Sequence, residues 1–126
     1  MDAGKVYKLV IPGKLPGLND YIRTERSNRH QAAKLKHREE EGIILEIRRQ
    51  WRKVRFDKPV YMRYTWVEAN RKRDKDNIAF ARKFIQDALV KAGTLQNDGW
   101  QHISGFDDRF EVDKKNPRII VEIWEV

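Results

Sequence analysis

The stretch from Arg71 to Asp76 places a run of cations directly before two closely spaced carboxylates. It reads Arg-Lys-Arg-Asp-Lys-Asp, and Asn77 follows it. Phosphodiester hydrolysis needs an activated water, neutralisation of charge on the phosphate and stabilisation of the leaving oxygen, and a hard divalent cation can supply all three. Mg²⁺ prefers oxygen ligands and keeps several waters, so a few carboxylates beside a substrate phosphate suffice. Asp74 and Asp76 are therefore candidate magnesium ligands in a site that cuts phosphodiester bonds.

The same aspartates have a structural alternative. Aspartate is a common residue just before a helix, where it caps free N–H groups and favours the positive end of the helix dipole. Asp74 and Asp76 could therefore serve only as helix caps. If one helix follows, at about 100° per residue Asp76, Lys83 and Asp87 lie on one ridge. Lys83 and Asp87 could equally form an ordinary surface ion pair four residues apart.

Composition favours a polyanionic partner. Lysine and arginine number 27 against 19 aspartates and glutamates, which gives a formal charge of +8, and such an excess favours binding to nucleic acid. There is no cysteine, so thiolate metal sites and disulfides are excluded. We expect DNA phosphates to be held by seven cations in or near the first predicted helix and in the basic run. These are Arg26, Arg29, Lys34, Arg71, Lys72, Arg73 and Lys75.

Neither a membrane anchor nor a leader is expected. No apolar run approaches the roughly 20 residues that cross a bilayer, and the first residues lack a continuous apolar stretch. We therefore expect a cytoplasmic protein with no membrane partner and no small-molecule cofactor. The length of 126 residues predicts one domain over 1–126.

Hydrophobic patterning predicts the order β-α-β-α-β-β. Residues 60–69 alternate as a strand should, and Leu35, Ile43, Ile44, Ile47 and Trp51 recur at helical spacing. We expect a two-layer α+β domain with two helices packed on one face of a mixed sheet. Trp66, Trp100 and Trp124 are expected in the core. The predicted strands cover 5–11, 60–69, about 102–112 and 118–126, and the predicted helices cover about 28–52, capped by Ser27 or Asn28, and 77–92.

Taken together, these segments resemble the RusA family of Holliday-junction resolvases of bacteria and their phages. The resemblance rests on Asp74-Lys75-Asp76-Asn77, on Asp87-Ala88-Leu89-Val90-Lys91-Ala92-Gly93 and on Asn97-Asp98, with looser agreement at Pro16–Asn19, Pro59-Val60 and Asn116–Arg118. It covers most of the chain. It implies a dimeric endonuclease of DNA recombination and repair that resolves four-way junctions by paired nicks, with Mg²⁺ or Mn²⁺ as cofactor.

The resemblance also assigns roles to single residues. It implies that Asp74, Asp76 and Asp98 bind the metal and that Lys83 is the catalytic lysine, aligned through the Asp-Ala-Leu motif that follows it. Asp87 matches a helix aspartate of secondary importance. Two hypotheses follow: a homodimeric, metal-dependent nuclease for branched DNA, and a non-catalytic basic nucleic-acid-binding module whose aspartates only cap a helix.

Overall fold

Four strands form one mixed sheet in the computed structural model, which describes residues 4–126. The strands lie in the order β1-β4-β2-β3. β2 pairs with β3 in parallel, whereas β4 is antiparallel to both of its neighbours. Each strand overlaps one of the predicted strands. Their bounds are β1 Tyr7–Pro12, β2 Val60–Glu68, β3 Ile103–Val112 and β4 Arg118–Glu125.

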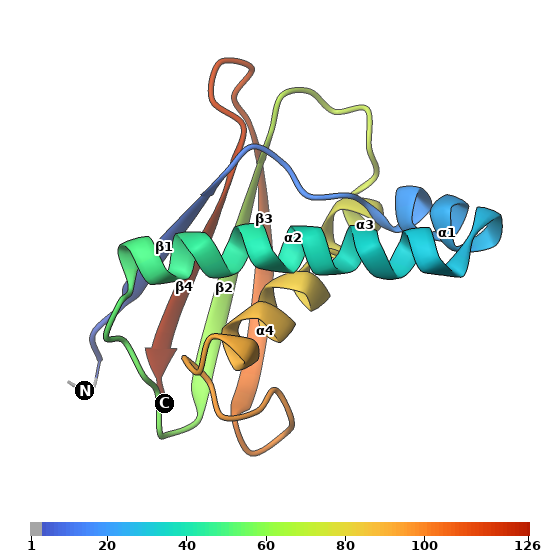
Figure 1. Cartoon of the computed structure of the whole chain (residues 1–126). Coiled ribbons are helices and arrows are strands. Elements are labelled where there is room, and N and C mark those ends of the chain that lie inside the picture. The colour runs from blue at the N-terminus through green and yellow to red at the C-terminus, as the bar shows by residue number, and fades with distance from the viewer. Residues whose placement is uncertain (1–3) are drawn as a thin grey trace.

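The helices form a second layer on the sheet. α2 and α4 cross in front of the sheet in Figure 1, and the short α1 and α3 lie side by side near one end of α2. The α+β class, the two layers and the mixed sheet are therefore confirmed. No helix among residues 4–126 combines the length and apolar character needed to span a membrane. The helix bounds are α1 Leu18–Ser27, α2 Arg29–Gln50, α3 Lys75–Ala79 and α4 Arg82–Lys91.

The side chain of Asn28 defines the start of α2. The Oδ1 atom of Asn28 accepts hydrogen bonds from the backbone N–H groups of His30 at 2.8 Å and Gln31 at 3.4 Å. This N-cap satisfies donors that have no partner inside the helix. The Asn28 cap confirms the predicted start. Of the predicted apolar stripe, Ile43, Ile44, Ile47 and the C-cap residue Trp51 are buried, whereas Leu35 is half-buried.

The far end of α2 closes one edge of the sheet. The side-chain amide of Gln50 accepts from the backbone N–H of Val10 at 2.9 Å and donates to the carbonyl of the same residue at 2.7 Å. The indole Nε1 of Trp51 donates to the carbonyl of Lys8 at 3.0 Å. Backbone groups on the outer side of β1 thus have side-chain partners in place of a further strand.

Two helical predictions need correction. The predicted order has no helix before the one that begins near residue 28, yet α1 occupies Leu18–Ser27. None of its side chains is fully buried, so it adds no residue to the core. The helix predicted over 77–92 is two helices, because α3 ends at Ala79 and α4 begins at Arg82.

A tightened turn separates α3 from α4. The N–H of Ala81 bonds the carbonyl of Ile78 at 3.2 Å, and the N–H of Lys83 bonds that of Phe80 at 3.2 Å. Three-residue spacing of this kind belongs to a 3₁₀ turn, which redirects the axis. No glycine or proline marks the break in the sequence. Asp76 and Lys83 therefore do not share the ridge of one continuous helix.

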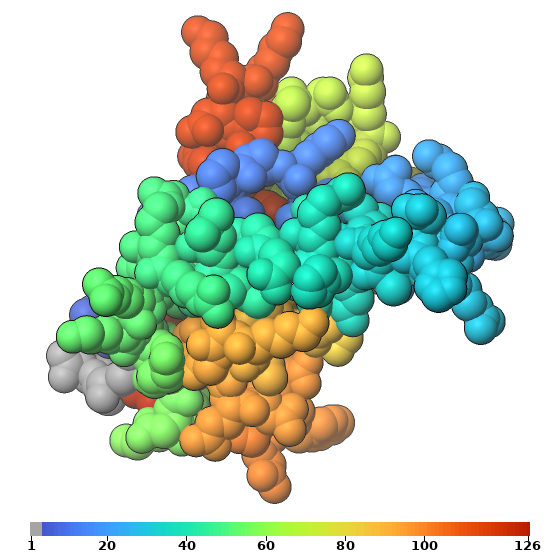
Figure 2. Space-filling model, viewed as in Figure 1, coloured from blue at the N-terminus to red at the C-terminus, as the bar shows by residue number. Residues whose placement is uncertain are grey.

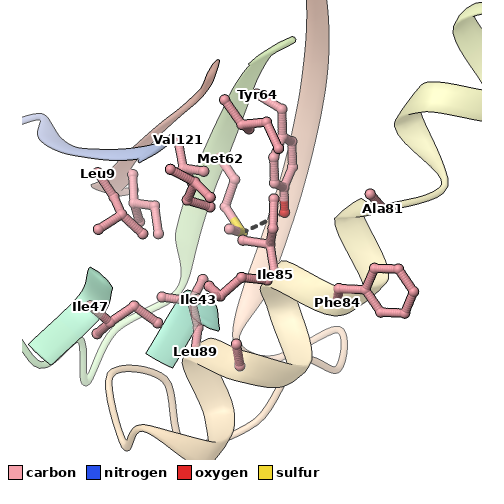
Figure 3. Close-up of a cluster of buried hydrophobic side chains, with 14 of the residues drawn as sticks. Leu9, Ile43, Ile47, Met62, Tyr64, Ala81, Phe84, Ile85, Leu89 and Val121 are labelled. Carbon is pink, nitrogen blue, oxygen red and sulfur yellow. Dashed lines mark hydrogen bonds between the residues drawn. The ribbon is translucent and has the colours of Figure 1, made fainter. Parts of the chain in front are cut away.

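The core lies between the helical layer and the sheet (Figure 3). Side chains from α2, α4 and three strands meet there, and each fully buried apolar side chain of this size stabilises the fold by about 1.5–3 kcal/mol. The central members are Leu9, Ile43, Ile47, Met62, Tyr64, Ile85, Leu89 and Val121.

The three tryptophans expected in this core have different surroundings. Trp66 is in the core with 1% of its surface exposed, but Trp100 is 99% exposed and lies in the loop after α4. Trp124 is half-buried, and its ring packs against that of Tyr61 with 5.1 Å between the ring centres. Its neighbour Ile123 faces the helices and is buried, so alternation along β4 turns Trp124 to the other face of the sheet. Only Trp66 therefore meets the expectation in full.

Candidate nucleic-acid and metal site

Two aspartates stand at the start of α3 without a strong structural use for their carboxylates. Asp74 occupies the N-cap position with extended backbone, but its side chain makes no capping hydrogen bond. Asp76 accepts only from the adjacent N–H of Asn77, at 2.9 Å. Both side chains are exposed, and neither forms an ion pair with any residue from 4 to 126. The hydrogen bond that would define Asp74 as a helix cap is therefore missing.

Asn77 anchors this short helix to the beginning of α1. Its Oδ1 atom accepts from the N–H of Asn19 at 2.9 Å. Gly17 lies against the same side chain, because a Cβ built there would be only 2.5 Å from that Oδ1 atom. The asparagine of the Asp-Lys-Asp-Asn motif thus holds two segments together. Sequence reasoning treated Asn77 only as part of a motif and missed this contact.

Asp74 and Asp76 open into neighbouring hollows. Asp74 lines one of about 480 Å³ beside the ends of β2 and β3. Asp76 lines a second of about 450 Å³. Lys75 and Phe110 contribute to both, and the Lys75 ammonium lies 5.5 Å from the centre of the Phe110 ring. The two carboxylates therefore flank one exposed cation on a continuous surface.

The second hollow contains a further carboxylate that sequence reasoning missed. Asp108 on β3 accepts from the indole Nε1 of Trp66 at 2.9 Å and is paired with Arg82. The Arg82 guanidinium lies 4.6 Å from the centre of the Phe106 ring. Alternation along β3 could have indicated that Asp108 faces the helices, because Phe106 and Phe110 are two residues away on either side. Asp108 is already neutralised by its partner.

Asp98 and Lys83 come together beside α4. The Lys83 ammonium lies 3.4 Å from an Asp98 oxygen and 3.1 Å from an Asp87 oxygen. The other Asp87 oxygen lies 3.1 Å from the ammonium of Lys36 on α2. Two lysines therefore share Asp87, and Lys83 bridges two aspartates. Lys36 was not among the predicted site residues, and no signal in the sequence connects α2 with α4 at this point.

The ion pairs fix the charge states of this group. The hydrogen bond to Asp87 is the main cause that raises the pKa of Lys83. Burial by itself would raise the pKa of Asp87, but hydrogen bonds from Lys36 and Lys83 outweigh burial and lower it. Lys83 is therefore an ammonium and Asp87 a carboxylate at neutral pH. The two ammonium groups and the two carboxylates balance in formal charge, so Lys83 is a positive group held in a locally neutral network.

The predicted phosphate-binding residues divide into two groups. Arg73 is engaged elsewhere, because it donates to both carboxylate oxygens of Glu68 at 2.9 Å and to the carbonyl of Leu15 at 3.0 Å. The structure gives this arginine a role in joining β2 to the loop before α1. The other six cations are exposed and form no ion pair within residues 4–126. They are Arg26, Arg29, Lys34, Arg71, Lys72 and Lys75.

The three aspartates expected to bind metal are not gathered into one cluster. Residues 4–126 contain no group of three or more histidine, aspartate or glutamate side chains placed to hold a metal ion. Asp74 and Asp76 lie near each other along α3, and Asp98 pairs with Lys83. Neither of the two hollows described above includes Asp98. The residues of the expected site therefore lie in two separate groups.

Comparison with known proteins assigns no family to the chain. No model of a known protein family matches the sequence. No curated protein matches it either. Any function must therefore be argued from the residues and their geometry.

Proposed function

We propose that the chain is a RusA-like endonuclease that binds four-way DNA junctions as a homodimer and nicks them with Mg²⁺. The observation that carries this proposal is the pair of exposed carboxylates at Asp74 and Asp76. They lack cation partners within the described part of the chain although Arg71, Lys72 and Lys75 surround them in the sequence. This is an acidic point on a basic surface.

Electrostatics favours a cation at this point. Two unit charges about 4 Å apart interact by roughly 4 kcal/mol at an effective dielectric near 20, so bare carboxylates oppose the approach of a phosphate. A divalent cation between carboxylate and phosphate reverses the sign of that interaction. The surrounding lysines and arginines attract the polyanion at longer range.

The carboxylates of Asp74 and Asp76 form a donor set that suits Mg²⁺. Mg²⁺ is commonly held by one or two carboxylates together with substrate phosphate and water, and Asp74 and Asp76 supply two carboxylates. Mn²⁺ accepts the same oxygen ligands. When bound, the cation would neutralise charge on the phosphate and activate a water. Asp98, the third ligand implied by the family resemblance, is a proposed ligand that would have to exchange its Lys83 partner.

The protein's own residues have separate roles in this proposal. Arg71 and Lys72 bind phosphates on either side of the cut and orient the strand. Lys83 carries a positive charge that stabilises the negative charge growing on the scissile phosphate. Asp87 positions that ammonium. A cluster of cations on α1 and α2 extends the binding surface: Arg26, Arg29 and Lys34.

A homodimer supplies the second cut. A four-way junction has near two-fold symmetry, and paired nicks need two sites related by the same symmetry. A C2 dimer of this chain would present two copies of the basic surface to opposite strands.

One observation favours the second candidate function, a basic DNA-binding module without catalysis. That observation is the absence of a three-ligand group among residues 4–126. A chain that keeps the basic surface but has lost the metal would bind branched DNA and leave it intact.

A junction-cleavage assay distinguishes the two functions. A synthetic four-way junction is incubated with the wild-type protein and with Asp76→Asn, each with Mg²⁺, Mn²⁺ or EDTA. We expect paired nicks by the wild type only when metal is present. Asp76→Asn should lose cleavage and bind the junction as tightly or more tightly, because repulsion falls. A wild type that binds the junction but never nicks it with either metal would rule out the nuclease and leave the binding module.

A further inference from the structure

Trp100 is the most exposed large apolar side chain among residues 4–126. It is 99% exposed, whereas Trp51 and Trp66 are 5% and 1% exposed. The segment that follows α4, orange in Figure 2, projects at the bottom of the view. An indole exposed to water contributes little to the stability of the fold, because its large apolar surface is not buried. The position therefore calls for a role outside the fold.

The backbone holds this indole on a defined turn. The carbonyl of Gly99 accepts from the N–H groups of both His102 and Ile103 at 3.0 Å. Trp100 lies inside that turn, and β3 begins directly after it at Ile103. The Trp100 backbone is thus anchored to the end of a strand, so presenting the ring to a ligand costs little backbone entropy.

The surroundings of Trp100 are polar. Gly99 and Gln101 on either side are exposed, and no aromatic ring of the described chain packs against the indole. Protein-binding hot spots lie at the centre of an apolar patch that excludes water, and such a patch is missing around Trp100 within residues 4–126. A lone flat ring among polar and charged groups suits a ligand that is itself flat and carries charge around it.

A predicted site residue close to Trp100 in the sequence indicates what kind of ligand the ring could contact. Asp98 lies two residues before Trp100 and is paired with Lys83. A phosphate that takes the place of Asp98 at the Lys83 ammonium would place a nucleic-acid strand beside the loop that carries both Asp98 and Trp100. Every nucleobase has a π-face, so stacking on an indole does not depend on sequence.

We propose that Trp100 is a stacking platform for an unpaired nucleobase of branched or gapped DNA. The inference rests on the proposed DNA-binding function but not on cleavage. Bases inside a duplex are stacked on their neighbours and cannot reach the ring, whereas bases at a branch point or a gap can leave the stack. Trp100 would therefore add affinity only for DNA that contains such a base.

Binding in EDTA tests the proposal, since no strand is then cut. The probes are a four-way junction, a duplex with a short single-stranded gap and an intact duplex, with 2-aminopurine placed at the branch or in the gap. We expect Trp100→Ala to weaken binding to the gapped duplex by about tenfold and to leave binding to the intact duplex unchanged. Trp100→Phe should keep most of the affinity. The wild type should quench 2-aminopurine fluorescence and Trp100→Ala should not.

Two controls separate base stacking from a general loss of apolar surface and from a loss of phosphate contacts. Leu45→Ala removes another exposed apolar side chain, 66% exposed on α2, and should change no affinity. The slope of log affinity against log salt should be the same for Trp100→Ala and wild type, because no phosphate contact is lost. Equal affinities of Trp100→Ala and wild type for gapped DNA would overturn the proposal.

The remaining outcomes distinguish this proposal from the proposed function. If Trp100→Ala changes the sedimentation of the protein and not its DNA affinity, the ring contacts a second protein chain, and the stacking proposal is overturned. If the wild type prefers gapped DNA through Trp100 but does not favour the junction, stacking is supported and the resolvase proposal fails. If the wild type nicks the junction and Trp100→Ala does so equally well with equal affinity, only the stacking proposal fails.

Discussion

Two pairs of aspartates in this chain have opposite surroundings. Asp74 and Asp76 are exposed, have no cation partner among residues 4–126 and sit at the start of a short helix. Asp87 and Asp98 lie beside α4 and are joined through Lys83, with Lys36 as a further partner of Asp87. The second pair thereby connects α2, α4 and the following loop, whereas the first pair connects no elements through its carboxylates.

The contrast shows how a cation partner changes the contribution of a carboxylate to stability. Charged groups that pair with lysines contribute to stability, and their removal leaves the lysines uncompensated. Unpaired carboxylates at one point repel each other and contribute little, so their presence favours a ligand that is not part of the chain. The two pairs should therefore respond in opposite ways to the same substitution.

The largest effect is expected on cleavage. Under the proposed function, Asp74→Asn should reduce the rate of junction nicking by more than about a hundredfold, because it removes a proposed metal ligand. Asp87→Asn keeps the proposed metal ligands and should reduce the rate less. Single-turnover cleavage of a labelled junction with Mg²⁺ measures both. Equal losses in the two variants would break the contrast between the pairs.

The next effect concerns the contact that holds α3 in place. Gly17→Ala puts a Cβ against Asn77, and overpacking of this kind costs about 1–3 kcal/mol. Urea denaturation should show the loss of stability. Glycine at position 42 is a matched control, because a Cβ there meets nothing within 4 Å; Gly42→Ala on the exposed side of α2 should be neutral or stabilising. An unchanged urea midpoint for Gly17→Ala would mean that α3 can shift away from the added methyl group at little cost in stability.

A smaller loss of stability is expected at the second pair. Asp87→Asn removes two charge-assisted hydrogen bonds at a partly exposed site, which we expect to cost about 1–2 kcal/mol. Asp74→Asn should stay within about 0.5 kcal/mol of the wild type. Chemical denaturation at pH 7 without metal compares the two. A larger loss at Asp74 than at Asp87 would contradict the assignment of structural and functional roles.

Metal binding should stabilise the folded protein through Asp74 and Asp76 and not through Asp87 and Asp98. If Mg²⁺ binds in the millimolar range, a concentration of about 10 mM should stabilise the native state by about 1 kcal/mol and raise the Tm by a few degrees. Asp74→Asn should abolish the shift and Asp87→Asn should retain it. Differential scanning fluorimetry with MgCl₂ against an equal ionic strength of NaCl gives the comparison. A shift that survives in Asp74→Asn would place the metal elsewhere.

The smallest effect is a pH dependence. The pKa of Asp87 in the folded chain lies below its ordinary value of 3.8, so its stabilising effect is present above about pH 4 and is lost as the pH falls through the folded pKa. The difference in unfolding free energy between wild type and Asp87→Asn should therefore be constant from about pH 7 to about pH 5 and shrink below about pH 4. A difference that persists at low pH would arise from packing and not from charge.

The sequence predicts the strands and the long helix well because their signals are local. Alternation in 60–69 defines β2, and Asn28 followed by the stripe through Ile43 and Ile47 defines α2. The break between α3 and α4 has no such signal, because the residues across it include no glycine or proline. Ile78 of α3 and Ile85 of α4 are both buried, so the apolar pattern continues across the break and does not reveal it.

The candidate site is only partly predictable for the same reason. Asp74, Asp76 and the basic run are adjacent in sequence, so their proximity follows from the chain itself. The contacts of Asp98 with Lys83 and of Lys36 with Asp87 join residues 15 or more positions apart, and no periodicity encodes them. The engagement of Arg73 by Glu68 was equally unpredictable, since a run of cations gives no indication of which one points inward.

The amide of Gln50 also restricts how copies of this chain can assemble. It offers Val10 the same donor and acceptor that a neighbouring strand would offer, so the β1 side of the sheet is closed to the addition of strands. The opposite margin, at β3, has no such cover within residues 4–126 and carries both signs of charge in Asp107, Asp108 and Arg109. Strand addition is thus blocked on one side by the hydrogen bonds of Gln50 and disfavoured on the other by charged side chains, which protects the chain from joining edge to edge.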